Sequence, residues 1–458
     1  MHRLSALLLT LVTTLLVVAE GVNASPIEQG DLAKKAASGV RRGHWVSTWT
    51  SMPQLTEPGN LPPEPFKEEE RVFFNSTIRQ TLHMSIGSDI IRIRFSNAFG
   101  TTDLPITAVT VALPEEENGG SGTSTIRSET LQTLTFSGSQ NYTIPSGALV
   151  VSDPINFPVK PQSVITVSVY LEEGQTTNYI TSHPGSRTTS WFSFGNYISA
   201  QNLTDPSTQS VEHWYFVSGV EAWSPTISKA FVVVGDSITD GRASDDNKNN
   251  RWPDLLLARM QENHFTSRIG VNNQAAGGNR LLHDGLGPNV LSRIDRDVLA
   301  QSGVGYAMVF EGVNDIGNEP TTTEAQKAVA ERLIAAYKQI ITRIHAHGIP
   351  VFGATIAPFC APDPKDQAYS DPTREMARQI VNKWIRTSGA FDAVVDMDKI
   401  LADPKNPDRL LPKYDSGDYL HPGVAGFQAI ADAFPLDIFR EFEDGTNSFT
   451  KKMKKRAA

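Results

Sequence analysis

Ala230-Phe-Val-Val-Val-Gly-Asp-Ser-Ile-Thr-Asp-Gly241 is the stretch that decides the fold of this chain. Residues 231–234 are a continuous aromatic and β-branched run, which predicts a short strand buried on both faces, as in a parallel sheet. The strand ends in Gly235-Asp-Ser237, so a hydroxyl group follows its carboxyl end, where ligands collect in open α/β sheets. Gly, Asp and Ser are also common turn formers, so this block alone does not separate a reactive site from a turn.

Three further polar blocks follow in a fixed order: Asn273-Gln-Ala-Ala-Gly-Gly-Asn-Arg280, Gly312-Val-Asn-Asp315 and Asp418-Tyr-Leu-His421. Together with Gly235-Asp-Ser237 they resemble the SGNH/GDSL hydrolase family of serine esterases. The resemblance covers roughly residues 225–440. Longer stretches around the blocks look like the branch that includes acetylxylan esterases, namely Gly235–Arg242, Asn250–Asp254, Gly278–Leu282, Arg296–Gln301 and Tyr414–Asp418.

The second half of the chain alternates strand-like and helix-like segments, which predicts a parallel sheet covered by helices. After residues 231–234 we expect strands at 269–271, 306–310, 350–355 and 393–396. Helices are expected at 252–261, 324–347, 373–387 and 424–442, the last one broken at Pro435. The family resemblance implies a flavodoxin-like three-layer α/β/α domain over residues 228–442.

Ester hydrolysis needs an activated nucleophile, a base and hydrogen-bond donors for the oxyanion. Ser237 supplies a hydroxyl, and His421 is the candidate base because imidazole titrates near neutral pH. Asp418 precedes His421 by three residues, a spacing that lets its carboxylate reach the imidazole in a helical turn or a tight loop. We therefore predict Ser237, Asp418 and His421 as the catalytic residues.

The predicted oxyanion hole has three donors. One is the backbone N–H of Ser237. The second is a glycine N–H of the Gly277-Gly278 pair, where a missing side chain allows close approach of the backbone; register against the family favours Gly278, with Gly277 as the alternative. The third is the side-chain amide of Asn314, although Asn after a strand is often only a turn former.

Other polar residues near these blocks could line a pocket. For Asp240 and Asp315 we favour hydrogen bonds that hold the loops. The remaining candidates for the pocket lining are Arg242, Arg251, Asn279 and Arg280.

The chain departs from the family pattern after His421, where Pro422-Gly423 replaces the more usual Pro-Asn and alters the cap of the last helix.

Residues 44–222 show alternating apolar and polar runs separated by Gly, Pro, Asn and Ser clusters, which predicts an antiparallel β-sandwich, jelly-roll-like in topology. The clearest runs are 90–95, 108–113, 131–136 and 163–171. This domain is either a carbohydrate-binding module or a lid that packs on the catalytic domain and shapes its cleft. Exposed tryptophans would favour sugar stacking, but we expect most of the candidates to be core residues: Trp45, Trp49, Trp191, Trp214 and Trp223.

The start of the chain has the features of a secretory signal peptide, residues 1–24. A charged start precedes the apolar run 4–19, and Val22-Asn-Ala24 resembles a cleavage site. The run is shorter than the ~20 residues that span a bilayer, and no stop-transfer segment follows. Residues 25–43 are expected to be a propeptide or flexible linker, and residues 443–458 a solvated basic tail.

The remaining sequence features agree with an extracellular protein. Asn75, Asn141 and Asn202 begin glycosylation sequons. Cys360 is the only cysteine, so no intrachain disulfide can form and thiolate metal sites are excluded; no cofactor or metal is expected. The formal net charge of −9, without a basic stripe, argues against nucleic acid as a partner.

The sequence thus predicts a secreted serine esterase that removes small acyl groups, acetyl in particular, from a polysaccharide such as xylan. Two alternatives stay open. One is a lipase or lysophospholipase of the same family, which would need an apolar acyl groove. The other is a carbohydrate-binding protein with a silent hydrolase domain, although the complete set of Ser, Gly, Asn, Asp and His argues against it. Oligomeric state is not indicated by the sequence.

Overall fold

The stretch 230–241 begins inside a five-stranded parallel sheet and ends in the turn that follows its second strand. In the computed structural model, which describes residues 42–115 and 117–446, strand β19 (Lys229–Gly235) runs between β20 (Ile269–Ala275) and β21 (Val304–Phe310). The strand order is β20-β19-β21-β22-β23 and every pairing is parallel, with β22 at Val351–Ala354 and β23 at Ala393–Val395. The five predicted strands of this half are confirmed, and β20 is longer than predicted.

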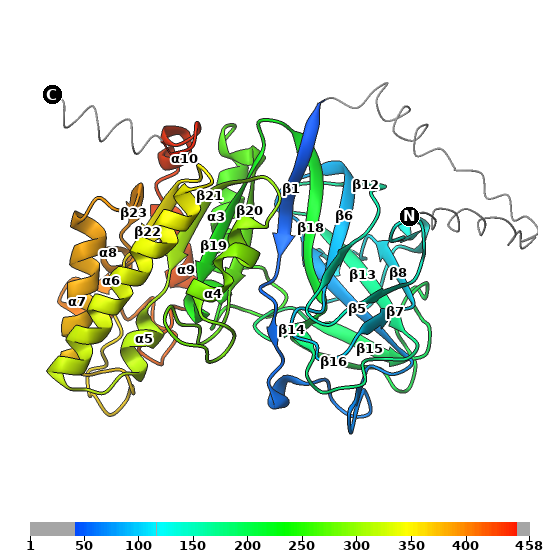
Figure 1. The fold of residues 1–458 in the computed structure, drawn as a ribbon, viewed down its shortest axis with the longest axis horizontal. Coiled ribbons are helices and arrows are strands. Elements are labelled where there is room, and N and C mark those ends of the chain that lie inside the picture. The colour runs from blue at the N-terminus through cyan, green and yellow to red at the C-terminus, as the bar shows by residue number, and fades with distance from the viewer. Residues whose placement is uncertain (1–41, 116, 447–458) are drawn as a thin grey trace, which may run out of the picture. The chain divides into compact units, whose positions relative to one another are not determined.

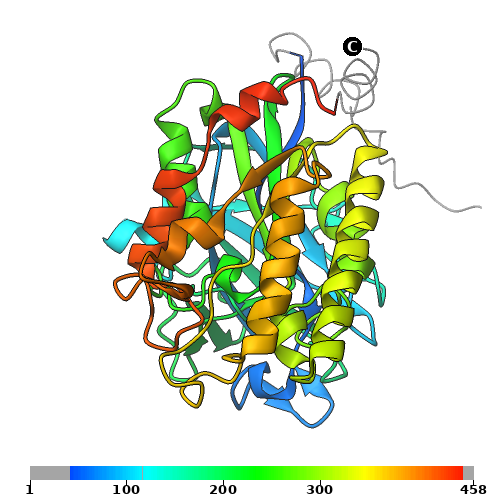
Figure 2. The same ribbon diagram turned by 90° about the vertical axis from the view of Figure 1, so that its left-hand side faces the viewer.

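Successive residues of β19 bury their side chains on opposite faces of the sheet, because side chains alternate along a strand. Val232 and Val234 pack in one apolar cluster with residues of helices α6 (Thr323–His345) and α7 (Pro372–Thr387). Phe231 and Val233 belong to a second cluster with residues of α3 (Trp252–Gln261), α9 (Val424–Ala433) and α10 (Asp437–Glu441). Helices therefore cover both faces of the sheet, and Figure 2 shows α6 and α7 side by side on one of them.

The long helices of this half agree with the prediction, including the break at Pro435 between α9 and α10. Short elements close to the chain's polar blocks were not predicted, because four to six residues give no helical period. They are helices α2 (Ser237–Asp240), α4 (Val290–Ile294), α5 (Val313–Asn318) and α8 (Met397–Leu401), a π-helical turn (Asp295–Leu299) and the hairpin of β24 (Ala402–Asp403) and β25 (Asn406–Leu410).

The first half of the described chain is built from antiparallel sheets, as predicted (Figure 1). Two larger sheets share one apolar core, to which β5, β6, β13 and β18 all contribute. One has the order β1-β18-β6-β11 with β12 also on β6, and the other the order β16-β15-β5-β13-β8-β9. The strands are β1 Gly43–Thr50, β2 Gln54–Leu55, β3 Lys67–Glu68, β4 Arg71–Val72, β5 Ser76–His83, β6 Ser88–Ser96, β7 Leu104–Ile106, β8 Ala108–Ala112, β9 Gln132–Thr133, β10 Tyr142–Ile144, β11 Leu149–Val151, β12 Ile155–Val159, β13 Val164–Leu171, β14 Thr181–His183, β15 Ser190–Phe194, β16 Gln209–Val211, β17 Trp214–Tyr215 and β18 Val217–Pro225.

One predicted strand is largely wrong. Residues 131–136 alternate as a strand should, but only Gln132–Thr133 form a strand, β9 on β8, and the last bond to β8 is that of the Leu134 N–H to Val109 O. Leu134 and Phe136 do face the core, so the alternation identified the buried side correctly. The backbone after them instead turns onto the Asp153 carboxylate, which accepts the N–H groups of Ser137 and Gly138.

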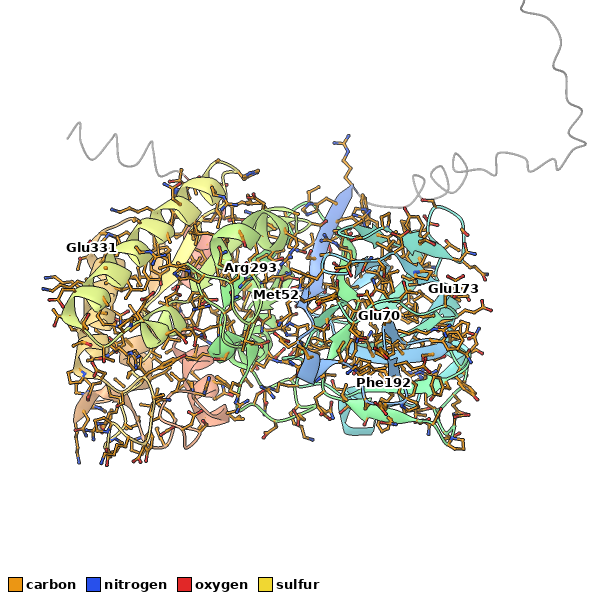
Figure 3. All side chains as sticks on the ribbon, turned by 60° about the horizontal axis from the view of Figure 1, so that its bottom comes forward. Met52, Glu70, Glu173, Phe192, Arg293 and Glu331 are labelled. Carbon is orange, nitrogen blue, oxygen red and sulfur yellow. The ribbon has the colours of Figure 1, made fainter. Side chains whose placement is uncertain are left out.

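The antiparallel part, which runs from β1 to the end of β18 (residues 43–225), lies against the edge strand β20 of the parallel sheet. Ser47 of β1 donates its N–H to Ser302 O at 2.9 Å, and Asn272 of β20 donates its side-chain amide to Ser47 O at 3.0 Å. A side chain at Gly270 would meet Ser47 O at 2.5 Å, so glycine permits this approach. From His44 onward the chain forms one compact unit. Figure 3 shows Met52 close to the junction of its two parts.

The remaining predictions concern the two ends of the chain and its domain limits. The signal peptide of residues 1–24 lies outside the described residues, as do most of the linker 25–43 and the tail 443–458. The domain limits 44–222 and 228–442 also stay predictions, although β18 ends at Pro225 and β19 begins at Lys229. Within residues 42–446, apart from Glu116, no helix has the length and apolar character that crossing a membrane requires.

Candidate active site

Ser237 begins the one-turn helix α2 directly after strand β19. Asp236 caps this helix, since its Oδ1 accepts the N–H of Ile238 at 3.0 Å. Gly241 ends it in a left-handed conformation with φ of 100°. A side chain at Gly235 would meet Thr239 at 2.4 Å, so only glycine allows so sharp an exit from the strand. The turn leaves Ser237 half-buried at the carboxyl edge of the sheet.

The structure brings Ser237, His421 and Asp418 together. Ser237 Oγ lies 2.8 Å from His421 Nε2, and His421 Nδ1 lies 2.6 Å from Asp418 Oδ2. Because the ionised carboxylate only accepts, Nδ1 carries the hydrogen and Nε2 offers its lone pair to the serine hydroxyl. The geometric prediction that these three residues meet is confirmed, in a loop before α9 rather than in a helical turn.

The Asp418 carboxylate is held by its own loop. Oδ1 accepts the backbone N–H groups of Leu420 at 3.0 Å and His421 at 2.8 Å. Partial burial raises the pKa of Asp418, but hydrogen bonds from the side chain and backbone of His421 outweigh it and hold that pKa well below its ordinary value. Asp418 is therefore a carboxylate throughout the pH range in which an imidazole base works.

Two backbone donors of the predicted oxyanion hole lie free beside Ser237. Neither the N–H of Ser237 nor that of Gly278 donates to any atom of the described residues. The N–H of Gly277, in contrast, donates to Asp240 Oδ2 at 2.9 Å. The choice of Gly278 over Gly277 therefore agrees with the hydrogen-bond pattern. Gly278 has φ of +70°, a conformation that disfavours any other residue.

Asn314 lies in the first turn of α5, just beyond β21. Its Nδ2 donates one hydrogen to Asn279 O at 3.0 Å, and its Oδ1 accepts the hydroxyl of Tyr369 at 3.1 Å. These two contacts fix which way the amide points. The second hydrogen on Nδ2 is left for a ligand in the cleft that Asn314 lines.

Ser237, His421 and Asn314 open onto a cleft of about 450 Å³. The antiparallel part supplies seven of its seventeen lining residues, and most of the seventeen have polar side chains. Nothing in the sequence marked these positions, because they belong to no motif and lie far from Ser237 along the chain. The residues from that part are Gln54, Glu57, Asn60, Pro184, Gly185, Arg187 and His213; the facing ones include Arg242, Leu286, Tyr369 and Leu420.

The other sequence candidates fall into two groups. Arg242 is exposed in the cleft, and Asp240 lines it from a buried position. Asp315 holds the loop after β20, as predicted, because its two carboxylate oxygens accept the N–H groups of Leu281 and Leu282. Arg251 and Asn279 are buried and serve structural contacts, the former with Asp254 and the latter with Arg293. Arg280 bonds the carbonyl of Asp284.

Buried carboxyl groups lie beneath the nucleophile. Burial raises the pKa of Asp236 to about 7, an effect that the N–H of Ile238 opposes. Burial and the nearby Asp236 also raise the pKa of Glu311 well above its ordinary value. A neutral carboxylic acid is the cheaper form in such a site, because an ion there would lose its hydration.

This arrangement has the parts for nucleophilic attack on a carbonyl. A serine hydroxyl contacts an imidazole, the imidazole contacts a carboxylate, and free N–H donors adjoin the hydroxyl. Among the residues that the structure describes, no group of three or more His, Cys, Asp or Glu side chains is placed to hold a metal ion.

Residues 233–429 match the model of the GDSL-like lipase/acylhydrolase family. No curated protein matches the chain. Solved structures that resemble it include a GDSL-like lipase from Bacteroides thetaiotaomicron, with 17% identity over 46% of this chain and 89% of that one and a TM-score of 0.34.

Two esterases are also among the similar structures. A catalytic mutant of an acetylxylan esterase from Geobacillus stearothermophilus has 19% identity over 46% of this chain and 94% of that one, with a TM-score of 0.34. A carbohydrate acetylesterase from Sinorhizobium meliloti has 13% identity over 47% of this chain and 100% of that one, with a TM-score of 0.35.

The family match contains Ser237, Gly278, Asn314, Asp418 and His421, the residues that the fold gathers at one edge of the sheet. Residues 233–429 are a domain of the GDSL-like lipase/acylhydrolase family, and the chain is therefore an ester hydrolase.

Proposed function

We propose that this protein hydrolyses short acyl esters, acetyl esters in particular, through an acyl-enzyme on Ser237. The observation that carries the proposal is the continuous contact from Ser237 Oγ through His421 to Asp418 at the floor of an open cleft. A serine hydroxyl without such a base is a weak nucleophile at neutral pH.

In the proposed reaction His421 Nε2 takes the proton of Ser237 Oγ while the oxygen attacks the ester carbonyl. Asp418 stabilises the imidazolium that forms. The N–H groups of Ser237 and Gly278 and the free amide hydrogen of Asn314 bind the oxyanion. His421 then protonates the leaving alcohol. The same imidazole then takes a proton from a water molecule, which attacks the acyl-enzyme. As the acid leaves, His421 returns that proton to Ser237 Oγ.

The lining of the cleft supports a short acyl group. A lipase needs an apolar groove for a long chain, whereas charged and amide side chains such as Glu57, Arg187 and Arg242 surround Ser237 here. The aliphatic side chains of the wall are those of Pro184, Leu286 and Leu420, and Leu286 is half exposed. Acetyl esters should therefore be cleaved faster than long-chain esters.

A polymeric acceptor, a polysaccharide such as xylan, is the second part of the proposal. A hollow of about 850 Å³ adjoins the cleft: Glu57 lines both, and Leu286 of the cleft stands between Gly285 and Gly287 of the hollow. Tyr179 lines the hollow with 58% of its surface exposed. An exposed phenol ring with an amide neighbour, Asn178, offers a stacking face and hydrogen bonds to a sugar chain.

The structural and cellular parts of the prediction belong to the same proposal. We retain a three-layer hydrolase domain, supported by helices on both faces of the sheet, and a jelly-roll-like topology for the antiparallel sheets. Secretion is supported by the N-terminal sequence and by exposed asparagines in two sequons, Asn141 and Asn202. Asn75 is half-buried and accepts the Tyr170 hydroxyl.

The central test is covalent labelling with a fluorescent organophosphonate, followed by a substrate screen. The wild-type protein should take the label and Ser237→Ala should not. Release of acetate from acetylated xylan should exceed release of long-chain acids from aryl esters. Labelling of Ser237→Ala would remove Ser237 from the mechanism, and faster hydrolysis of long-chain esters would favour the lipase alternative.

The acceptor is tested at Tyr179. Tyr179→Ala should lower the rate on acetylated xylan several-fold and leave the rate on an aryl acetate unchanged, because the small ester does not reach the hollow. Ile227→Ala is the matched control, since Ile227 is equally exposed at 58% but lines neither hollow. Equal rates on xylan for both variants would contradict a sugar site there.

A further inference from the structure

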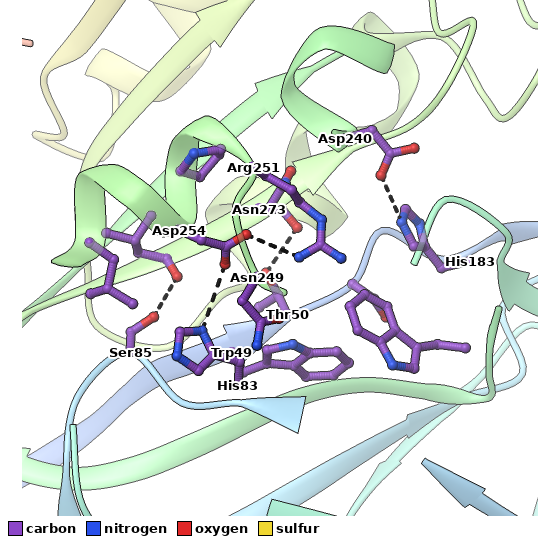
Figure 4. Close-up of a pocket in the computed structure, with 15 residues that line it drawn as sticks. Trp49, Thr50, His83, Ser85, His183, Asp240, Asn249, Arg251, Asp254 and Asn273 are labelled. Carbon is purple, nitrogen blue, oxygen red and sulfur yellow. Dashed lines mark hydrogen bonds and ion pairs between the residues drawn. The ribbon is translucent and has the colours of Figure 1, made fainter. Parts of the chain in front are cut away.

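The antiparallel part reaches the helix of the nucleophile through one buried pair. His183 ends β14, and Asp240 is the last residue of α2, the helix that Ser237 begins. His183 Nε2 lies 2.9 Å from Asp240 Oδ1, and both residues are 5% exposed. Figure 4 shows the two side chains pointing toward each other from different parts of the chain.

The second oxygen of Asp240 holds the glycine loop of the oxyanion hole. Asp240 Oδ2 accepts the N–H of Gly277 at 2.9 Å. The next peptide along presents the free N–H of Gly278, and only the Cα of Gly277 separates the two peptides, so a displacement of one moves the other. Asp240 thus connects the nucleophile helix, the oxyanion loop and the antiparallel part in one set of contacts.

His183 is itself fixed on three sides. Its Nδ1 lies 3.0 Å from Met52 O, and its ring stacks on Trp214 with centroids 5.8 Å apart and planes inclined by 25°. Since a carbonyl oxygen only accepts, Nδ1 carries a hydrogen. A proton must then also lie between Nε2 and Asp240 Oδ1. Gly185 leaves room for the pair, because a side chain there would lie 1.9 Å from Asp240 Oδ2.

We propose that His183 and Asp240 are positioning residues, through which the antiparallel part sets the geometry of the oxyanion hole. His183 orients Asp240, Asp240 orients the Gly277 peptide, and that peptide aims the N–H of Gly278 at the site of the oxyanion. This inference rests on the proposed ester hydrolysis at Ser237. It makes the first half of the chain a working part of the active site.

The test compares four variants by steady-state kinetics on an aryl acetate and by inhibition with an arylboronic acid, which forms a tetrahedral adduct on the serine. Asp240→Ala removes both contacts, so kcat should fall by about 10²-fold with KM nearly unchanged, and the inhibition constant should rise in proportion. Asp240→Asn should stay within several-fold of the wild type, because its amide can donate to a neutral His183 Nε2 while its oxygen still accepts from Gly277.

Ser85→Ala is the control for a purely structural effect. Ser85 is buried and donates to Val271 O at 2.7 Å, a hydrogen bond between the same two parts of the chain that does not touch the oxyanion loop. This variant should have a lower Tm and an unchanged kcat. Adding His183→Ala to Asp240→Ala should cause little further loss, because both act through the same contact.

Two results would overturn the inference. Asp240→Ala with the kcat of Ser85→Ala would show that the pair only stabilises the fold. Asp240→Asn as impaired as Asp240→Ala would show that charge, and not the hydrogen-bond pattern, matters. A failure of the proposed function is distinct from both, because Ser237→Ala would then retain the wild-type rate.

Discussion

Asn314 is the residue whose proposed role depends most on the direction of a single amide. Tyr369 and Asn279 hold it so that one N–H stays free. Asn314→Ala should therefore lower kcat about 10²- to 10³-fold on an aryl acetate, with a small change in KM. Tyr369→Phe removes one neutral hydrogen bond, worth about 1 kcal/mol, and should cost less than about tenfold. A kcat within twofold of wild type for Asn314→Ala would exclude it from the oxyanion hole.

Asp236 gives the stability of the protein a dependence on pH. Its carboxyl ionises near 3.8 in the unfolded chain but only at about 7 in the folded one, because the folded site is buried. Between these values the folded state binds more protons, so the free energy of unfolding falls as pH rises, by at most about 1.4 kcal/mol per pH unit from this group. Below about pH 4 the group is neutral in both states and has no effect.

Asp236→Asn should remove this contribution. Asparagine caps a helix as well as aspartate does, so α2 is preserved. Urea unfolding at a series of pH values should show equal stabilities near pH 4 and a variant that becomes progressively more stable than wild type up to pH 7. Asp89→Asn, an exposed substitution, serves as the control. A variant less stable than wild type at pH 7 would contradict the burial argument.

Among single residues, the sequence predicted those site residues that belong to a recognisable motif. Ser237, Asp418 and His421 could be named because their types and order suit one chemistry. His183, Glu57 and Tyr369 could not, since a lone histidine, acid or tyrosine has no spacing that marks it. These residues meet Asp240, the cleft and Asn314 only because the chain folds back from 50 to nearly 200 positions away.

Among the elements, helix α9 begins where the chain departs from the family pattern, at Pro422-Gly423. Gly423 is the N-cap of this helix and provides no side-chain hydrogen bond. A side chain there would have no heavy atom closer than 3.8 Å, and its φ of −81° suits any residue. Gly423→Asn should raise the free energy of unfolding by about 0.5–1 kcal/mol, through the cap and a less flexible unfolded chain.

Gly426 is the matched control in the same helix. Alanine is the better helix former, but a Cβ at this position would lie 2.7 Å from Pro422 Cβ and 3.1 Å from Tyr414 O. Gly426→Ala should therefore lose about 1–3 kcal/mol, as overpacked sites do. Thermal and urea unfolding of both variants will show whether they shift in opposite directions. A gain for Gly426→Ala would mean that the loop before α9 can move aside.

The elements themselves were predictable where burial imposes a period. The strands of the parallel sheet are continuous apolar runs, and α6 and α7 carry apolar residues three and four apart. Residues 131–136 show the limit of such patterns, because alternation reports which side faces the core and says nothing of backbone pairing. There the chain leaves β8 after Leu134 and turns, and the Asp153 carboxylate accepts the N–H groups of Ser137 and Gly138 just beyond the predicted strand.

On the scale of the whole molecule, the change of pattern near residue 225 predicted two domains, and the contacts between them were not foreseeable. They are glycines and small polar groups: Gly270 lets Ser47 approach, and Ser85 bonds Val271 O. Ala230 of β19 shares a small buried cluster with Val46, Ile86 and Ala222 of the antiparallel part. None of these residues lies in a sequence pattern that indicates an interface.

The hydrolase half should therefore not work alone. A fragment of residues 226–446 would expose the backbone edge of β20, which could then pair with strands of other chains. The fragment would also leave Asp240 without His183. We expect most of it to be insoluble, and any soluble fragment to have a kcat no higher than that of Asp240→Ala. The control is a fragment of residues 42–446, which contains both parts of the molecule and should keep the wild-type kcat. Sedimentation and aryl-acetate kinetics compare the two. A monomeric fragment with full activity would show that the antiparallel part serves the substrate and not the catalytic geometry.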